Sequence, residues 1–319
     1  MKEENQPILP KTSYRPPYLI RIFIDFLYET VNVGPEYGIK VTTVVENFRA
    51  LFYFGLLATI LVGYIVTTNF VTEDHAKVVT DVFGVHNICS YLDFPPSTYI
   101  APICYIFPMF AMIAYNVVSI FRINISYGEQ KISNLAKNLL VASHVYIIIS
   151  VIWFLSIFEV HPDRENPITM VIHTIPYFNI KITFVVLQLS VVWFGANVAW
   201  KDIGFSTFGK KVFITLSWLH VIVLIVTATV SCVFILNALG DMGPGGLVGK
   251  GLWFDVHDPP KQIAVLMSIF ENTGPLGDFI QAILIPFLHS LFLKFQSFRN
   301  ISKTHTVIFY ITDNKSVDE

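Results

Sequence analysis

Histidines and carboxylates border one short polar segment of the chain, at Glu159, His161 and His173. Imidazole and carboxylate groups donate and accept hydrogen bonds and exchange protons near neutral pH. A short connection would bring these three side chains together, and they then form a candidate site for a polar ligand. The alternative is that His161-Pro162-Asp163 is only a turn, because proline and aspartate are natural turn residues.

Other ionisable residues fall inside long apolar stretches, at His144, His220 and His289. Such groups are costly within a membrane, so they serve either function or helix packing. Three amides in similar stretches are predicted to join helices through hydrogen bonds: Asn116, Gln188 and Asn197.

Glu271 and Asp278 are seven residues apart, a spacing that places both carboxylates on one face of a helix. If the last apolar helix begins near Gln262, both carboxylates lie in the membrane and need partners. If it begins near Pro275, Glu271 is a loop residue. No histidine, cysteine or carboxylate pair has the spacing of a metal site, so the sequence predicts neither a metal nor a cofactor.

The elements that must position these residues are membrane-spanning helices. The chain has 319 residues, of which 54% are hydrophobic and only 14% are charged, whereas a soluble domain carries about 25% charge. Apolar stretches of about 20 residues can cross a bilayer. Five stretches meet this length and a sixth contains Gly274-Pro275 and Pro286: they are 50–71, 99–121, 139–160, 180–200, 212–239 and 262–295. The predicted fold is therefore an all-α membrane bundle of six transmembrane helices.

The distribution of lysine and arginine predicts the orientation of the spans. With a cytosolic N-terminus, sixteen such residues fall on the cytosolic side and five fall on the other side, where they are Lys77, Arg164, Lys181, Lys250 and Lys261. Both chain ends are therefore predicted to be cytosolic. The three glycosylation triplets, which begin at Asn124, Asn300 and Asn314, then lie on the cytosolic side and stay unmodified.

Outside the spans the sequence contains no segment that resembles a separate soluble domain. Residues 1–48 form a predicted cytosolic segment, residues 49–295 the transmembrane domain, and residues 296–319 a cytosolic tail. Within the first segment, residues 18–28 interleave apolar side chains with Arg21 and Asp25. This pattern predicts a short amphipathic helix, either at the membrane interface or packed on the bundle. The net charge of −2 argues against a nucleic-acid partner.

The order of several features resembles the Frag/DRAM/Sfk superfamily of six-span membrane proteins, which includes the Golgi post-GPI-attachment factor. The resemblance rests on residues in the connections and the last span: Cys89 before Pro95-Pro96-Ser97, Arg122, Asn134-Leu135, Glu159, Ile172-His173 and Glu271. It implies a six-span bundle in the endoplasmic reticulum, the Golgi or another endomembrane, or in the plasma membrane. It also implies a role in remodelling or sorting GPI-anchored proteins, or in organising phospholipids.

Three functions remain open. In the first, which is lipid handling, a lipid head group binds at the exoplasmic face to Glu159, His161, His173 and Glu271. In the second, the chain is a non-catalytic accessory or scaffold subunit of a larger membrane complex, with other membrane proteins as partners. In the third it is a channel or carrier whose polar pathway includes His144, His220 and Asp278. No classical enzyme activity is predicted.

Overall fold

The computed structural model describes residues 39–70, 83, 88–160, 166–198, 200, 205–240, 242–243, 246–247, 250–300 and 306–311. The predicted N-terminal helix at residues 18–28 lies outside these ranges. Side chains are not described at residues 39–44, 89, 167, 242–247, 270–275, 297–300 and 306–311.

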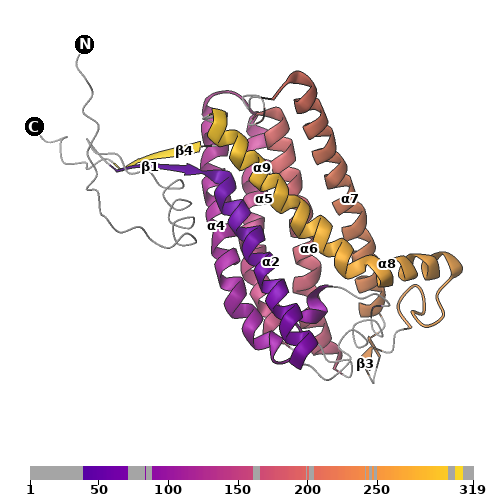
Figure 1. The fold of residues 1–319 in the computed structure, drawn as a ribbon. Helices are drawn as coiled ribbons and strands as arrows, with labels where there is room; N and C mark the ends of the chain where they lie inside the picture. The colour runs from indigo at the N-terminus through magenta and orange to yellow at the C-terminus, as the bar shows by residue number, and fades with distance from the viewer. Residues whose placement is uncertain are drawn as a thin grey trace, which may run out of the picture. The chain divides into compact units, whose positions relative to one another are not determined.

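The described part of the chain is dominated by long helices (Figure 1). In chain order they are α2 (Val45–Phe70), α4 (Ser97–Gly128), α5 (Asn134–Trp153), α6 (Pro167–Asn197), α7 (Thr207–Leu239), α8 (Lys261–Phe279) and α9 (Ile285–Asn300). A 3-10 helix, η1 (Ile88–Tyr91), precedes α4, and a second one, η2 (Phe154–Phe158), extends α5. A π-helix, η4 (Ile280–Leu284), joins α8 to α9.

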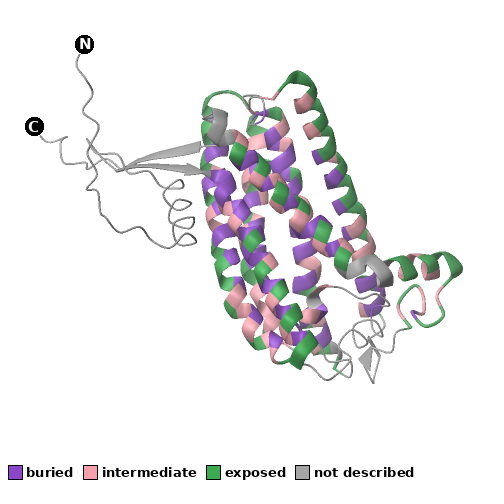
Figure 2. Ribbon diagram, viewed as in Figure 1, coloured by how far each residue is buried: buried purple, intermediate pink, exposed green. Residues whose placement is uncertain are grey.

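Six of the described helical segments are long and apolar enough to cross a membrane, so the predicted six-span, all-α bundle is confirmed. The spans are Val45–Phe70, Ser97–Gly128, Asn134–Phe158, Ile168–Asn197, Thr207–Leu239 and Leu276–Gln296. Large apolar side chains cover the outside of these helices, as at Phe54, Ile103 and Ile222, which are 56%, 71% and 55% exposed. Figure 2 shows exposed residues along the outer faces and buried residues between the helices. Such a surface suits lipid rather than water.

The predicted fourth span began too late, because α6 begins at Pro167 rather than near Ile180. The helix begins at this point because the Asn166 side chain accepts a hydrogen bond from the backbone N–H of Ile168, at 3.1 Å. Proline at the first helical position suits such a start. His173 and Lys181 therefore lie within a span, and Lys181 does not belong to the loop charges.

The last span is continuous, although Gly274-Pro275 suggested a break. Helix α8 includes both residues, and the part of the last span that the structure describes runs from Leu276 to Gln296. Glu271 lies in the same helix as Asp278, seven residues before it. Figure 1 shows α9 crossing the bundle and α8 projecting beyond its side.

Helix α2 packs against both α4 and α9, while α4–α5, α5–α6 and α6–α7 are neighbours in sequence as well as in space. Close approach of α2 and α4 depends on Gly55, because a Cβ atom there would lie 3.0 Å from the Pro108 ring. A hydrogen bond between the Thr67 and Ser97 hydroxyls joins the same two helices at their other end.

The connection after α7 is held by one buried amide. Asn237 Oδ1 accepts hydrogen bonds from the backbone N–H groups of Trp253, at 2.8 Å, and Phe254, at 3.1 Å. Its Nδ2 donates to the carbonyl oxygen of Phe254 at 3.0 Å. Gly251 has a φ of +70° and packs against this amide, a conformation that glycine adopts without steric cost.

The strands are short. In the same connection β2 (Met242–Gly243) pairs antiparallel with β3 (Gly246–Leu247). Strands β1 (Ile39–Val44) and β4 (Thr306–Ile311) form a separate two-stranded sheet.

Candidate functional site

Helix α6 carries a stripe of three functional side chains, His173, Tyr177 and Lys181. Their spacing of four residues places them on one face of the helix. All three face the interior of the bundle, where their exposed fractions are 6%, 7% and 8%. We call these three residues the α6 stripe.

Lys181 forms an ion pair within the membrane-spanning region. Its Nζ lies 2.6 Å from Oδ2 of Asp278, which the last span contributes. The same ammonium lies 5.3 Å from the centre of the Tyr177 ring. Because a buried charge without a counter-charge is strongly unfavourable, each partner makes the other tolerable in the membrane. Asp278 thus has the partner that its predicted position in the membrane required.

Gln281 connects this ion pair to α7. Its Nε2 donates to Oδ1 of Asp278 at 3.3 Å, and its Oε1 accepts a hydrogen bond from the Thr227 hydroxyl at 2.8 Å. His220 Nε2 donates to the backbone carbonyl oxygen of Gln281 at 2.8 Å. His220 therefore fixes the backbone of Gln281, whose side chain bonds to Asp278.

The backbone explains why Gln281 needs His220. In η4 the N–H of Ile285 bonds to the carbonyl of Ile280, five residues earlier. The same register would pair residue 286 with Gln281, but Pro286 has no N–H. His220 supplies the missing donor. The π-helix and the proline thus create an acceptor that fixes α7 against the last span.

His173 joins α6 to the two connections at the same end of the bundle. Its Nδ1 donates to the carbonyl oxygen of Val160 at 2.8 Å, and its Nε2 lies 3.4 Å from Oδ1 of Asp93. Both ring nitrogens therefore face acceptors. A neutral imidazole can donate from only one nitrogen, so this geometry favours a proton shared between His173 and Asp93 or an imidazolium–carboxylate pair.

An apolar cavity lies beside the α6 stripe. It is narrow and partly open, with a cavity volume of about 40 Å³. It is lined by Phe52, Leu56, Thr59, Ile60, Ile88, Leu92, Tyr105, Phe154, Phe158, Tyr177, Ile180, Lys181, Phe184, Asp278, Ala282 and Ile283. Among these lining residues, Lys181 and Asp278 are the charged ones. Apolar walls with a few placed polar groups are typical of small-molecule sites.

His173 and its two partners, Asp93 and Val160, are each close in sequence to a residue that lines this cavity. Asp93 follows the lining residue Leu92, Val160 lies two residues after Phe158, and His173 lies one helical turn before Tyr177. The segments that line the cavity therefore also carry the residues of the His173–Asp93 pair.

The predicted head-group residues are only partly brought together. His173 is buried and paired, but its partner is Asp93 rather than Glu159, which ends η2 as an exposed residue. His173 nevertheless bonds to Val160, the residue after Glu159, so the two segments lie close together as predicted. The head-group role of these residues stays a prediction. His161 lies outside the described residues, and so does the side chain of Glu271.

The other intramembrane polar residues differ in their contacts. His144 Nδ1 lies 2.6 Å from Oδ1 of Asn116, which joins α5 to α4 and confirms the predicted role of Asn116. Asn197 was predicted wrongly, since its side chain donates to Trp193 O of its own helix at 2.8 Å. Gln188 is fully buried, and neither amide atom has a hydrogen-bond partner in the described ranges, so the predicted bond to another helix is not found there.

Metal binding finds no support in the described part of the chain, where no group of three or more histidine, cysteine or acidic side chains could hold an ion.

Comparison with known proteins gives no relative. No family model, no curated protein and no solved structure matches this chain. The site must therefore be interpreted from its own geometry.

Sequence reasoning missed Lys181 and Tyr177 as site residues. Lys181 looked like a loop charge because the span was placed too late. The available signal was the four-residue spacing from His173 through Tyr177 to Lys181, preceded by Asn166-Pro167, which is a helix start.

Proposed function

We propose that this multi-pass membrane protein binds a lipid, with one hydrocarbon chain in the cavity beside the α6 stripe. The supporting observation is an apolar cavity inside the bundle whose lining residues include a single ion pair, Lys181–Asp278. Aromatic and aliphatic walls suit a hydrocarbon chain. An ammonium has three N–H donors, and Asp278 accepts one. A ligand oxygen in the cavity can accept another.

The finer proposal concerns the type of lipid. The polar part of the ligand would lie toward His173 and Asp93, at the end of the bundle that the charge distribution assigns to the exoplasmic side. The resemblance to the Frag/DRAM/Sfk superfamily supports the lipid of a GPI anchor, or a phospholipid, as the ligand. Handling such a lipid means holding or presenting it, and no covalent step is proposed.

The first test fills the cavity and measures bound lipid. Ile60→Trp and Ile180→Trp place an indole in the space from α2 and from α6. Ile222→Trp is the matched control, because Ile222 lies on the outer face of α7. Lipid that co-purifies with each protein in mild detergent is quantified by mass spectrometry.

We expect the two cavity variants to retain several-fold less of one lipid class than the wild type, while the control retains it fully. Monodisperse elution of all variants shows that they fold. Equal lipid retention in all four proteins would rule out the cavity as the binding site.

The second test concerns the lipid class. In cells that express only His173→Ala, we expect the lipid composition of GPI anchors to change while the protein reaches its membrane in normal amounts. Lipid analysis of released anchors measures this change. Normal anchors combined with altered phospholipids would move the proposal to phospholipid handling.

The chain's state in the membrane distinguishes lipid handling from the accessory-subunit alternative. If this chain handles lipid alone, the particle obtained by native purification should have the mass of the single protein. A stoichiometric large partner would instead support a subunit role.

A further inference from the structure

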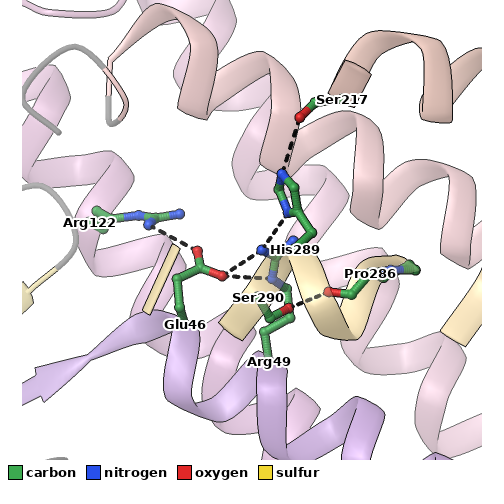
Figure 3. Close-up of polar contacts among 7 residues, drawn as sticks. All are labelled: Glu46, Arg49, Arg122, Ser217, Pro286, His289 and Ser290. Carbon is green, nitrogen blue, oxygen red and sulfur yellow. Dashed lines mark hydrogen bonds and ion pairs between the residues drawn. The ribbon is translucent and has the colours of Figure 1, made fainter. Parts of the chain in front are cut away.

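A second group of buried charges lies where α2 begins and α4 ends. Arg49 Nη2 lies 2.6 Å from Oε2 of Glu46, and Arg49 Nε donates to the same oxygen at 2.7 Å. Arg122 Nη1 lies 4.0 Å from the other carboxylate oxygen of Glu46, beyond hydrogen-bonding distance. Figure 3 shows both guanidinium groups directed at this one carboxylate. We call these three residues the arginine cluster.

His289 adds no charge to the cluster. Its Nδ1 lies 3.0 Å from Arg49 Nη2, which can only donate, so Nδ1 must accept. Its Nε2–H then donates to the Ser217 hydroxyl at 3.3 Å, and that hydroxyl donates to Phe213 O at 2.8 Å. His289 is therefore neutral in this arrangement, and it stacks on the Phe213 ring at 5.0 Å.

Within the part of the chain that the structure describes, the cluster has an excess positive charge and donors without acceptors. Two guanidinium groups and one carboxylate leave a formal charge of +1. Arg49 and Arg122 are 0% and 5% exposed. Arg49 Nη1 and both Nε and Nη1 of Arg122 have no hydrogen-bond partner among the described residues. Buried donors of this kind are costly unless an acceptor, here an anionic one, completes them.

A cavity near this end of the bundle is lined in part by Phe194, the residue whose ring contacts Arg122. Its volume is about 270 Å³, and it is lined by Lys131, Ile132, Ala136, Leu140, Trp193, Phe194 and Asn197. The guanidinium of Arg122 lies 4.8 Å from the centre of the Phe194 ring. Lys131 pairs with Glu129 at 2.8 Å, but both side chains are largely exposed. Such surface pairs are weak and can exchange partners.

We propose that the arginine cluster and Lys131 form an anion site for the phosphate group of a phospholipid in the leaflet at this end of the bundle. The phosphate enters through the cavity beside Phe194 and accepts hydrogen bonds from Arg122 and Lys131, with Arg49 behind Arg122. It supplies the negative charge that Glu46 alone does not. This site is separate from the cavity beside the α6 stripe and does not depend on the function proposed for that cavity.

The test uses the purified full-length protein in a neutral detergent. Short-chain phosphatidic acid is the phosphate probe, short-chain phosphatidylcholine is the zwitterionic lipid control, and inorganic phosphate is the free-anion control. Binding is followed by isothermal titration calorimetry and by tryptophan fluorescence, because Trp193 lines the cavity. Arg122→Gln removes the guanidinium group that is proposed to bind the phosphate. Lys211→Gln removes an equal charge from an exposed position near the start of α7.

We expect phosphatidic acid to bind, Arg122→Gln to weaken its binding about tenfold or more, and Lys211→Gln to change it less than about twofold. Ala136→Trp keeps every charge but blocks the cavity, and it should weaken binding as Arg122→Gln does. This second variant keeps the test decisive if Arg122→Gln fails to fold.

Two results would overturn the proposal: no binding of phosphatidic acid, or equal weakening by Lys211→Gln and Arg122→Gln, which would indicate surface charge alone. If inorganic phosphate binds as tightly as phosphatidic acid, a lipid is ruled out as the source of the phosphate.

Discussion

At the scale of single residues, the Lys181–Asp278 ion pair lets two charges lie beside an apolar cavity. Neither charge is tolerable alone among apolar side chains, and the 2.6 Å contact couples them. A hydrophobic pair of similar volume, by contrast, can replace a buried ion pair with little loss of stability.

This coupling predicts a non-additive pair of substitutions. We expect Lys181→Met and Asp278→Leu each to lower the free energy of unfolding by about 3–5 kcal/mol, because each leaves a buried charge unpaired. The double variant should be close to wild type. Denaturant titration of the three proteins in detergent measures the difference. Additive losses in the double variant would show that the two charges are not coupled.

The ionisable residues could be found from sequence, but their pairing could not. Asp278 and His173 stand out as polar groups beside or within apolar stretches. Their partners, Lys181 and Asp93, come from other segments, at separations of 97 and 80 residues. A single sequence carries no periodic signal at such separations, so only the folded structure identifies the pairs.

At the scale of helices, the π-helix at Ile280–Leu284 sets the position of the last span. Single π turns are rare and often occur at functional sites. Here the turn lies directly after Asp278 and exposes the Gln281 carbonyl to His220. The register of Asp278 against Lys181 therefore depends on α7 as well as on α6.

A double-mutant cycle can test whether His220 donates to the Gln281 carbonyl in place of the N–H that Pro286 lacks. His220→Leu removes the donor, and we expect a loss of about 1–3 kcal/mol in stability, the cost of a buried acceptor without a partner. In a Pro286→Ala background residue 286 regains its N–H, so the same substitution should cost clearly less. Thermal unfolding of the four proteins in detergent provides the comparison. An unchanged cost in both backgrounds would contradict the account of the π-helix.

The connection after α7 depends on Asn237 in a similar way. Asn237→Ala removes two accepted hydrogen bonds and one donated bond. We expect amide hydrogen exchange at residues 252–257 to accelerate about tenfold or more, while exchange in the core of α6 stays unchanged. Asn69→Ala is the matched control, because the exposed Asn69 side chain bonds within its own helix. Equal acceleration in both variants would indicate a general loss of stability.

Helix ends were harder to predict than helices. Five stretches were recognised from length and apolar content alone, and the sixth was recognised with uncertain limits. The start of α6 was misplaced because His173, Pro176 and Lys181 resemble a polar loop in isolation. Their polar groups are satisfied only by residues from other helices, and Pro176 is accommodated within α6.

At the scale of the whole molecule, six spans place both ends of the membrane domain on one side of the bilayer. The charge distribution predicts that this side is cytosolic. An engineered glycosylation acceptor between Gly128 and Asn134 should remain unmodified, whereas one in the connection between Leu239 and Lys261 should be modified. A mass-shift assay in cells checks both sites. The reverse pattern would invert the assignment of the two membrane faces.

The two cavities then belong to different leaflets. The cavity beside the α6 stripe is associated with the end of the bundle that contains His173, and the arginine cluster lies toward the end where α2 begins. An anion held at one end and a lipid chain held within the bundle are independent features, and each has its own test.

The central claim is that the bundle holds a lipid chain beside Lys181 and Asp278. The most direct measurement is an electron cryo-microscopy map of the protein in lipid nanodiscs, at a resolution that shows hydrocarbon chains. We predict a continuous tubular density between α2, α6 and the last span that passes within contact distance of Phe184 and Ile283. A space closed by side chains, or one without density in a well-resolved bundle, would contradict the account.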